Sequence, residues 1–487
     1  MNSQGHKWLT SSRMTHHQGL LCENPHVQLE TVRMLNPITF LPTEAGTRDH
    51  NCKEVIDETY SSTETPLTQA LAAEGAEVCY KDGVEHIPST YRFVNSTLVV
   101  YTPAVPEEHP QMQYFRRGGF KMEKRSQMLG HLSEGKYVMA VAGTHGKTTT
   151  STLIAWLNQA TEMGGNAFLG GISKNFDSNL VLGKGDRLAV EADEFDRSFL
   201  RLKPDVAVIT SVAADHLDIY GTYEAVVEAF GEFAALIKQG GALVLKQGVE
   251  IPLPEGIDIW RYSYDCTDSD FYAKNISLCE GGYYDFDVVT PDGVIEGCHL
   301  GIPGWVNVEN AVAAVASMWC AAKSRGESLD LDKLRKGLRE YQGVKRRFEF
   351  YVNTPRQVYM DDYAHHPEEL EATITSVRKM FPGRKLTAVF QPHLYTRTRD
   401  LYREFAAALS HADEVVLVPI YPAREEPIEG VGSEMIAELV GVPTSICERE
   451  NLAQMLGAAE TDVVVSFGAG NIDAYCGAIA EELAKKA

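Results

Sequence analysis

The sequence lacks several features that would each point to a particular class of protein. It has nine cysteines among 487 residues, and no two of them are spaced Cys-x-x-Cys. This pattern favours neither a zinc ribbon nor a disulfide framework, so we expect reduced thiols. No apolar run is long enough to span a bilayer, and residues 1–20 contain no apolar core of signal-peptide length. We therefore expect a cytoplasmic protein without a membrane span.

Positive charge is also scarce. The chain has 45 Lys and Arg against 67 Asp and Glu, which gives a formal net charge of -22. Nucleic acids and anionic membranes require a basic patch, so we expect neither as a partner. An acidic protein binds anions through backbone N–H groups, helix N-termini and a few basic side chains, and these are the features to look for.

The length and the order of apolar segments predict the domain organisation. A chain of 487 residues corresponds to roughly two to four domains. From Thr65 onward, short apolar strands alternate with helices, which is typical of parallel, doubly wound α/β sheets. We expect three α/β units with boundaries at 1–134, 135–348 and 349–487, and an antiparallel section formed by residues 240–247 and 282–297. Residues 1–62 show no clear periodicity.

One short stretch has the composition of a phosphate-binding loop. Residues 137–154 read YVMAVAGTHGKTTTSTLI, an apolar strand followed by Gly143, Gly146, Lys147 and Thr148 and then a helix. Two glycines let the backbone turn tightly and present N–H groups to an anion, and the helix N-terminus faces the same point. Lysine adds a cation for the outer phosphates, and the threonine hydroxyl is a ligand for Mg²⁺. The spacing G-x-x-G-K-T is shorter than that of the usual phosphate loop.

Acidic residues at two other strand ends are candidate metal ligands. The segment VEADEFDRSF places Glu191, Asp193, Glu194 and Asp196 after an apolar strand, and SVAADHLDIYG ends a second strand with Asp215, His216 and Asp218. Mg²⁺ takes oxygen ligands and bridges phosphates, so carboxylates beside a phosphate loop fit that role. Several of these residues are expected to be solvated turn residues only.

Eight motifs occur in the order found in one enzyme family. They are GTHGKTTT, EADEFD, ADHLDIYG, NVENAVAA, GVKRRFE, DDYAHHPEEL, FQPHLYTRTRD and FGAGNID. Together they resemble the Mur ligase family, the ATP-dependent amide-bond-forming ligases of peptidoglycan synthesis, from about Thr65 to the C-terminus. The resemblance implies an N-terminal Rossmann-like domain for a UDP-sugar, a central P-loop ATPase and a C-terminal Rossmann-like domain that binds the amino acid.

The resemblance also implies roles for individual residues. Lys147, Glu191, His216, Arg347 and His365 resemble catalytic residues, and Thr148, Glu191 and His216 resemble the magnesium ligands. Tyr363, His365 and Arg397 resemble residues at the muramate and alanine end of the cleft. The residues that resemble an ATP site are Gly143, Thr144, His145, Gly146, Lys147, Thr148, Thr149, Asn307, Asn310, Arg347 and Asp362.

The motifs further indicate which reaction to expect. QPHLYTRTRD resembles the family members that join L-alanine to UDP-N-acetylmuramate, whereas DDYAHHP is shared with those that recycle a murein tripeptide onto the same sugar. The implied activity uses ATP and Mg²⁺ and passes through an acyl phosphate, with UDP-N-acetylmuramate and L-alanine as substrates. The tripeptide-recycling reaction is the alternative. We expect a monomer or a weak homodimer.

One departure from the family pattern concerns the first domain. The family begins with a Gly-rich turn, G-x-G-G-x-G-M-S, that holds the UDP diphosphate. Residues 1–62 contain only Gly5, Gly19 and Gly46, which are far apart, so the first βα unit is atypical and lacks its main backbone anion site. A second hypothesis follows, in which the protein binds ATP but is inactive as a ligase.

Overall fold

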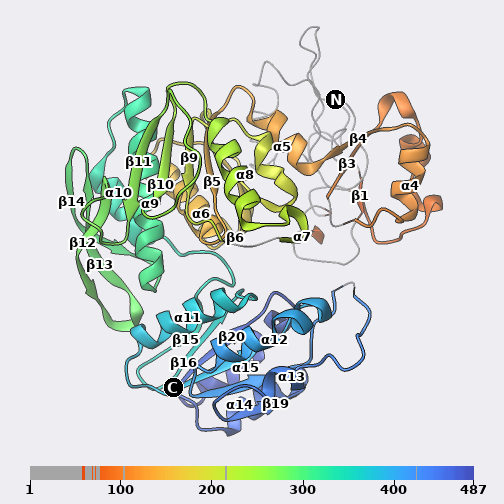
Figure 1. Cartoon of the computed structure of the whole chain (residues 1–487), viewed down its shortest axis with the longest axis vertical. Helices are drawn as coiled ribbons and strands as arrows, with labels where there is room; N and C mark the ends of the chain where they lie inside the picture. Colours follow the sequence, from red (N-terminus) through yellow and green to blue (C-terminus); the bar gives the residue numbers. More distant parts are fainter. Residues whose placement is uncertain are drawn as a thin grey trace, which may run out of the picture.

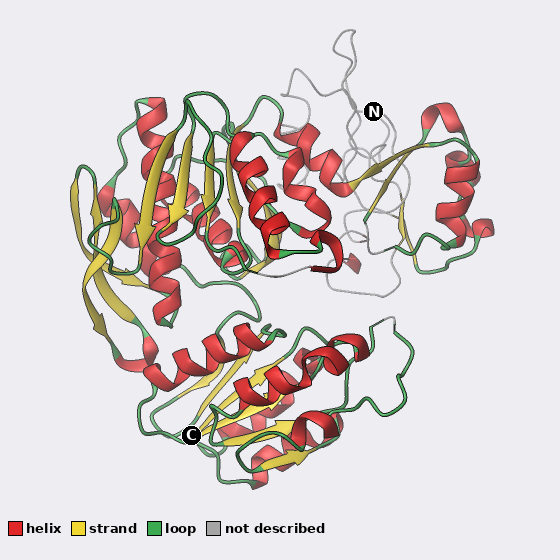
Figure 2. Cartoon of the chain, in the orientation of Figure 1, coloured by secondary structure: helices red, strands yellow, loops and turns green. Residues whose placement is uncertain are grey.

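The computed structural model of this chain describes residues 58–60, 68–69, 72, 77–102, 105–213, 217–423 and 425–487. Three groups of strands and helices follow one another along the chain, and helices flank the strands in each group (Figures 1 and 2). This arrangement confirms the predicted series of α/β units. Within the described ranges, no helix is long and apolar enough to cross a membrane.

The first group is small and has short strands. Its strands pair in parallel as β1 with β2 and β3 with β4, and a compact apolar cluster lies beneath helix α4. The sequence of residues 114–132 predicts a segment that contains helix, and within this segment the polar stretch KMEK forms strand β4. The elements are β1 (Glu58–Tyr60), β2 (Glu77–Cys79), β3 (Leu98–Tyr101), α4 (Pro110–Arg117), β4 (Lys121–Lys124) and α5 (Arg125–Ser133).

The second group contains a ten-stranded sheet in the order β14-β13-β12-β11-β10-β9-β5-β8-β6-β7. Strands β13 and β14 confirm the antiparallel pairing predicted for residues 282–297, and β12, which was not part of the prediction, extends it. The prediction was wrong for residues 242–246, because β10 pairs in parallel with both of its neighbours. The strands are β5 (Tyr137–Ala142), β6 (Asn166–Ser173), β7 (Ser178–Val181), β8 (Arg187–Glu191), β9 (Val206–Ile209), β10 (Ala242–Lys246), β11 (Asp258–Ser263), β12 (Phe271–Leu278), β13 (Tyr284–Thr290) and β14 (Gly293–Leu300).

Helices cover both faces of this sheet and enclose two apolar cores. One core lies under α6, α9 and α10, and the other lies under α8. The central strands β5 and β9 are buried on both faces, which explains their continuous apolar sequences. The helices are α6 (Lys147–Ala160), α7 (Leu217–Tyr220), α8 (Tyr223–Ala235), α9 (Trp305–Arg325) and α10 (Leu331–Glu340).

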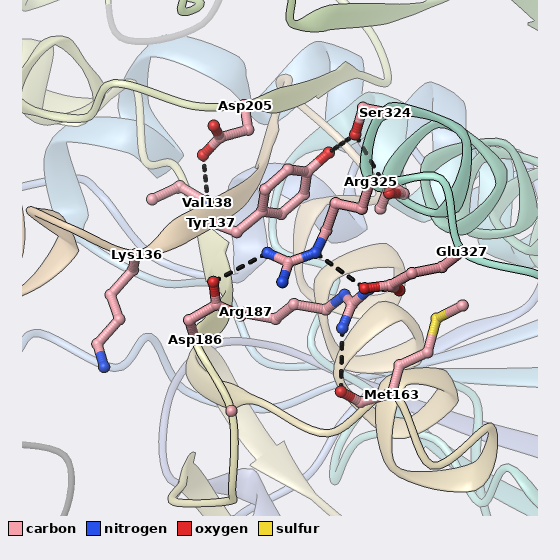
Figure 3. Close-up of polar contacts among 12 residues, drawn as sticks. Lys136, Tyr137, Val138, Met163, Asp186, Arg187, Asp205, Ser324, Arg325 and Glu327 are labelled. Atoms are coloured by element: carbon pink, nitrogen blue, oxygen red, sulfur yellow. Dashed lines mark hydrogen bonds and ion pairs between the residues drawn. The ribbon is translucent and has the colours of Figure 1, made fainter.

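A polar network fixes the C-terminal end of α9 near the amino ends of strands β5 and β8 (Figure 3). The Arg325 guanidinium donates to Asp186 Oδ2 at 2.9 Å and to Glu327 Oε1 at 2.9 Å. Arg187 also pairs with Glu327, and the hydroxyls of Tyr137 and Ser324 lie 2.5 Å apart. Because α9 is held at this end, its N-terminal end has a fixed position near the carboxyl ends of the central strands.

The third group contains a six-stranded sheet in the order β15-β16-β20-β17-β18-β19, parallel except for β15. Helices α11, α12 and α13 cover one face, and α14 and α15 cover the other. The elements are β15 (Glu349–Asn353), β16 (Val358–Asp362), α11 (Pro367–Met380), β17 (Leu386–Phe390), α12 (Tyr395–Leu409), β18 (Glu414–Leu417), α13 (Glu434–Ala437), β19 (Thr444–Ile446), α14 (Leu452–Ala458), β20 (Val463–Phe467) and α15 (Cys476–Ala484).

Candidate active site

The predicted phosphate loop connects the end of β5 to the start of α6. Gly143 and Gly146 have φ values of 134° and 83°, a region that favours glycine. Steric contacts also exclude larger residues at both positions. A Cβ on Gly143 would lie 2.1 Å from Thr210 Oγ1, and a Cβ on Gly146 would lie 2.8 Å from Asn310 Oδ1. The chain therefore turns tightly here and enters α6 at Lys147, where the first N–H groups of a helix have no intrahelical acceptor.

The end of strand β9 holds this loop in place. The N–H groups of Thr144 and His145 donate to the carbonyl and hydroxyl oxygens of Ser211, at 3.1 and 2.8 Å. The Thr210 hydroxyl donates to the His145 carbonyl at 2.5 Å. The backbone groups at the start of the loop are thus occupied by protein. The N–H groups at the start of α6 are the ones oriented for a phosphate.

Lys147 forms a buried ion pair with Glu194. The Lys147 Nζ atom lies 2.8 Å from Glu194 Oε1, and Glu194 is only 2% exposed. Burial by itself lowers the pKa of Lys147, but the carboxylates of Glu194, Asp193 and Glu191 raise it above its ordinary value, so the lysine is a cation. Burial raises the pKa of Glu194 despite the lysine. Its second oxygen, Oε2, has no hydrogen-bond partner among the described residues.

Glu191 lies at the end of β8, beside Thr148. The carboxylate accepts the Gly170 N–H at 3.2 Å and is within hydrogen-bonding reach of the Thr148 hydroxyl. Burial raises its pKa, while Lys147, Thr148 and Arg347 act in the opposite direction. Two oxygen donors at the mouth of a phosphate loop fit a divalent cation such as Mg²⁺. The buried, unpartnered oxygen of Glu194 nearby also fits positive charge at this place.

The N-terminal end of α9 brings two asparagines to the phosphate loop. Asn307 donates to the Pro303 carbonyl at 2.6 Å, and Asn310 donates to Asn307 Oδ1 at 3.2 Å. The Asn310 oxygen also lies 3.4 Å from the Thr150 hydroxyl on α6. Asn310 therefore lies against the phosphate loop at Gly146, and Asn307 accepts a hydrogen bond from Asn310.

The segment between α10 and β15 brings two arginines to the start of the third group. Arg346 donates to Asp361 Oδ2 at 2.9 Å and to the carbonyls of Gly470 and Gly468 at 3.2 and 2.5 Å. The Arg346 side chain therefore fixes this segment on the third group. The Arg347 guanidinium lies 5.3 Å from the centroid of the Tyr363 ring, a cation–π distance.

Asp362 supports the same junction from inside the protein. Its two carboxylate oxygens accept the N–H groups of Phe348 and Ala364, at 2.9 and 3.0 Å. Burial raises its pKa to about 6, although Arg347 lowers it. The structure thus shows Asp362 holding backbone at the junction. Its expected contact with ATP stays a prediction.

Glu369, at the start of α11, links the second and third groups. It accepts the N–H groups of His365 and His366 at 2.9 and 3.2 Å, and its Oε2 lies 3.2 Å from His365 Nδ1. His145 of the phosphate loop approaches Glu369 Oε1 at 3.8 Å. Burial alone would raise the pKa of Glu369, but His365 and Arg347 hold it well below the usual range. This carboxylate is therefore ionised, and it lies between the phosphate loop and the third sheet.

A histidine that we did not predict lies close to His365. The ring centroids of His393 and His365 are 6.2 Å apart, and His393 stacks on Tyr421 at 5.6 Å. Burial, with the charges of Arg397 and His365, lowers the pKa of His393 to about 4, so it is neutral at pH 7. Tyr363, His365, His393 and Arg397 therefore form one polar cluster at the carboxyl ends of β16 and β17.

The structure brings together most of the residues that the sequence singled out. His216 and its neighbour Asp215 are not among them, because they lie outside the described residues. Sequence reasoning did not give Arg346, Glu369 and His393 a role. Glu369 had a usable signal, because the segment from His366 to Glu369 forms a capping box with proline at the first helical position.

Comparison with known proteins agrees with this site. A curated UDP-N-acetylmuramate–L-alanine ligase from Parabacteroides distasonis is 46% identical over 432 residues, which cover 88% of this chain and 92% of that protein. Residues 60–137 match the Mur ligase family catalytic domain, residues 141–318 the Mur ligase middle domain, and residues 346–470 the Mur ligase glutamate ligase domain. The chain belongs to the Mur ligase family. The matched ranges follow the three groups of elements seen in the fold.

Solved structures of Mur ligases share the architecture. The UDP-N-acetylmuramate–alanine ligase from Thermotoga maritima has a TM-score of 0.71 and 24% identity, covering 88% of this chain and 94% of that one. A MurF ligase from the same organism, solved in complex with ADP, has a TM-score of 0.57 and 17% identity, covering 88% and 96%. At these identities the likeness establishes the three-part fold.

Proposed function

We propose that this Mur ligase joins L-alanine to the carboxylate of UDP-N-acetylmuramate, with ATP as the energy source. The observation that carries the proposal is the meeting of two sets of residues from different sheets. The phosphate loop with Lys147 and Glu191 lies at one sheet, and the cluster of Tyr363, His365 and Arg397 lies at the other. His145 of the loop approaches Glu369 of the third group at 3.8 Å. The name of the relative with 46% identity supports this choice of substrates.

The first chemical step transfers the γ-phosphoryl group of ATP to an oxygen of the muramoyl carboxylate, giving an acyl phosphate and ADP. A free carboxylate does not react with an amine at neutral pH, because its leaving group would be an oxide. The N–H groups of α6 and the ammonium group of Lys147 would stabilise the charge on the phosphates, and Arg347 would approach from the junction. The MurF ligase solved with ADP supports a nucleotide site in this fold.

Mg²⁺ fits the donors at the mouth of the loop. Thr148 and Glu191 would hold the ion, with His216 as the predicted ligand of a second one. When bound, Mg²⁺ supplies positive charge that offsets the triphosphate and the carboxylate. The remaining charge stabilisation is assigned to Lys147 and to the first N–H groups of α6.

In the second step, the alanine nitrogen attacks the acyl carbon, a tetrahedral intermediate forms, phosphate leaves and the nitrogen loses a proton. His365 is positioned for this end of the cleft, because Glu369 and the Tyr363 carbonyl engage its Nδ1 atom at 3.2 and 3.1 Å. This leaves Nε2 as the nitrogen that would exchange a proton with substrate. Arg397 would bind the alanine carboxylate. Contact between the second and third groups of elements would exclude water, which would otherwise hydrolyse the acyl phosphate.

The direct test is phosphate release from ATP with UDP-N-acetylmuramate and L-alanine, each omitted in turn. We expect release only when both are present. Release that does not depend on either substrate would contradict the proposal. Replacing L-alanine with the murein tripeptide tests the recycling alternative, which predicts faster release with the tripeptide.

A second candidate is a nucleotide-binding protein without ligase activity, favoured by the missing Gly-rich turn in residues 1–62. It predicts that Mg²⁺–ATP raises the melting temperature while UDP-N-acetylmuramate does not. A clear shift with the UDP-sugar would reject this candidate.

We place the enzyme in the cytoplasm, as a monomer or a weak homodimer.

A further inference from the structure

A group of metal-ligating side chains lies away from the candidate active site, on the antiparallel section of the central sheet. Cys279 follows β12, Asp285 is in β13 and His299 is in β14. These three strands form the edge of the sheet farthest from β7 and extend toward α11 (Figure 1). The reaction proposed above does not use these residues.

The strand register places the three side chains on one face. Asp285 is paired directly with His299 across the antiparallel strands and with Ser277 on its other side. Cys279 is two residues beyond Ser277, so it continues on that face. The alternate residues Tyr284 and Leu300 are buried in the core. The Cys279, Asp285 and His299 side chains therefore project from the opposite, accessible face.

The ligand atoms are already close together. One sulfur, one ring nitrogen and one carboxylate oxygen of these residues all lie within 4.8 Å of one another. The shortest separation is 2.6 Å, between His299 Nδ1 and Asp285 Oδ1. The His299 ring stacks on Tyr283 with centroids 6.0 Å apart, which restricts its orientation. Adjustments of the three side chains alone would place them around an ion with bonds of about 2.0–2.3 Å.

We propose that Cys279, Asp285 and His299 form a binding site for a zinc-like divalent cation. A thiolate, a carboxylate and a neutral imidazole supply two negative charges, which match one divalent ion. Sulfur and nitrogen donors select Zn²⁺ and similar transition metals over Mg²⁺ and Ca²⁺, which take oxygen ligands. Three protein ligands leave the fourth tetrahedral position for water.

The position of the site gives metal binding a structural consequence. The turn from Cys279 to Tyr283 contacts the third group of elements, since a Cβ on Gly282 would lie 2.7 Å from Met380 Sδ on α11. The Gly282 carbonyl also accepts the N–H of Gly304, which precedes α9, at 3.0 Å. An ion that ties Cys279 to β13 and β14 would fix this turn against both neighbours.

The test is a titration of the full-length, reduced protein with Co²⁺, a spectroscopic substitute for Zn²⁺, in excess Mg²⁺. We expect a thiolate-to-cobalt absorption band that Zn²⁺ abolishes. In Cys279→Ser, the number of Co²⁺ equivalents that produce this band should fall by one. His299→Gln should weaken the binding at least about tenfold, since even outer-shell changes at metal sites cost 10–100-fold.

Cys447→Ser is the matched control, because Cys447 is also a partly exposed free thiol. Its titration should equal that of the parent. Two results would overturn the proposal. One is the absence of a thiolate band in the parent, and the other is a band of unchanged size in Cys279→Ser. The variants change surface residues outside the candidate active site, so ligase activity without added Co²⁺ or Zn²⁺ should be retained.

Discussion

The substitution Lys147→Met tests the buried pair at the centre of the candidate site. It removes the ammonium group but keeps a long side chain, so Glu194 remains 2% exposed without its cation. A buried charge left alone costs about 3–5 kcal/mol of folding stability. Glu194 can avoid this cost by binding a proton, at about 1.4 kcal/mol for each pH unit above an ordinary glutamate pKa of about 4.3.

Glu194 can stay charged without a partner or bind a proton, and the choice between these two outcomes makes the loss of folding stability depend on pH. At pH 5.5, protonation is the cheaper outcome and costs about 1.6 kcal/mol. At pH 8, protonation would cost about 5 kcal/mol, so the loss reaches about 3–5 kcal/mol. The sign follows from burial, which raises the pKa of Glu194 even beside Lys147. The folded state holds a proton that the unfolded chain releases, so stability falls as pH rises through this window and then levels off.

Urea denaturation of the nucleotide-free protein at the two pH values measures this effect. Tryptophan fluorescence reports on the central group, which contains Trp156, Trp260, Trp305 and Trp319. The double variant Lys147→Met/Glu194→Gln has neither charge of the pair and should recover most of the loss at pH 8. A loss that is equal at both pH values, or unchanged in the double variant, would refute the reasoning. Turnover should fall at least about 100-fold in the single variant.

Two further substitutions test the loop and the link between sheets. Gly143→Ala would place a Cβ 2.1 Å from Thr210 Oγ1 at a φ of 134°. We therefore expect that Mg²⁺–ATP no longer raises the melting temperature of this variant in a thermal-shift assay. A retained shift would argue against nucleotide binding at this loop. Glu369→Gln removes the carboxylate that holds His365, and we expect at least about a tenfold rise in KM for L-alanine, with an unchanged KM counting against this positioning role. Because the pKa of Glu369 is depressed, the ionised side chain stabilises the folded state above an ordinary glutamate pKa, and this contribution is lost at lower pH. The difference in unfolding free energy between the parent and Glu369→Gln should therefore narrow below about pH 4.

The phosphate loop could be predicted from sequence because its chemistry is local. Gly143, Gly146 and Lys147 are consecutive parts of one strand–turn–helix, and the observed φ values follow from that turn. Glu191 could be predicted as well, since it ends a continuous apolar strand. The sequence could not predict that Lys147 pairs with Glu194 rather than with Glu191, because both acids lie on the same short segment.

Other errors arose where identical local patterns permit different partners. The apolar segment of β10 is compatible with parallel or antiparallel pairing, and its neighbours β9 and β11 decided the outcome. The polar segment of β4 forms a strand because its backbone pairs with β3, which its sequence does not reveal. Site residues are therefore easiest to predict where one element carries the chemistry.

The sequence by itself determined the three α/β units and the tight turn at Gly143 and Gly146, because each depends on residues that are near one another along the chain. It also determined the family, because the eight motifs keep their order along the chain. The tertiary structure alone decided which charges meet. His145 reaches Glu369 only because the loop after β5 lies near α11 of the third group. Cys279 reaches His299 only because β12, β13 and β14 lie in one sheet. Electrostatic and coordination energies depend on distances of a few ångströms, and the fold sets those distances for residues far apart in the chain.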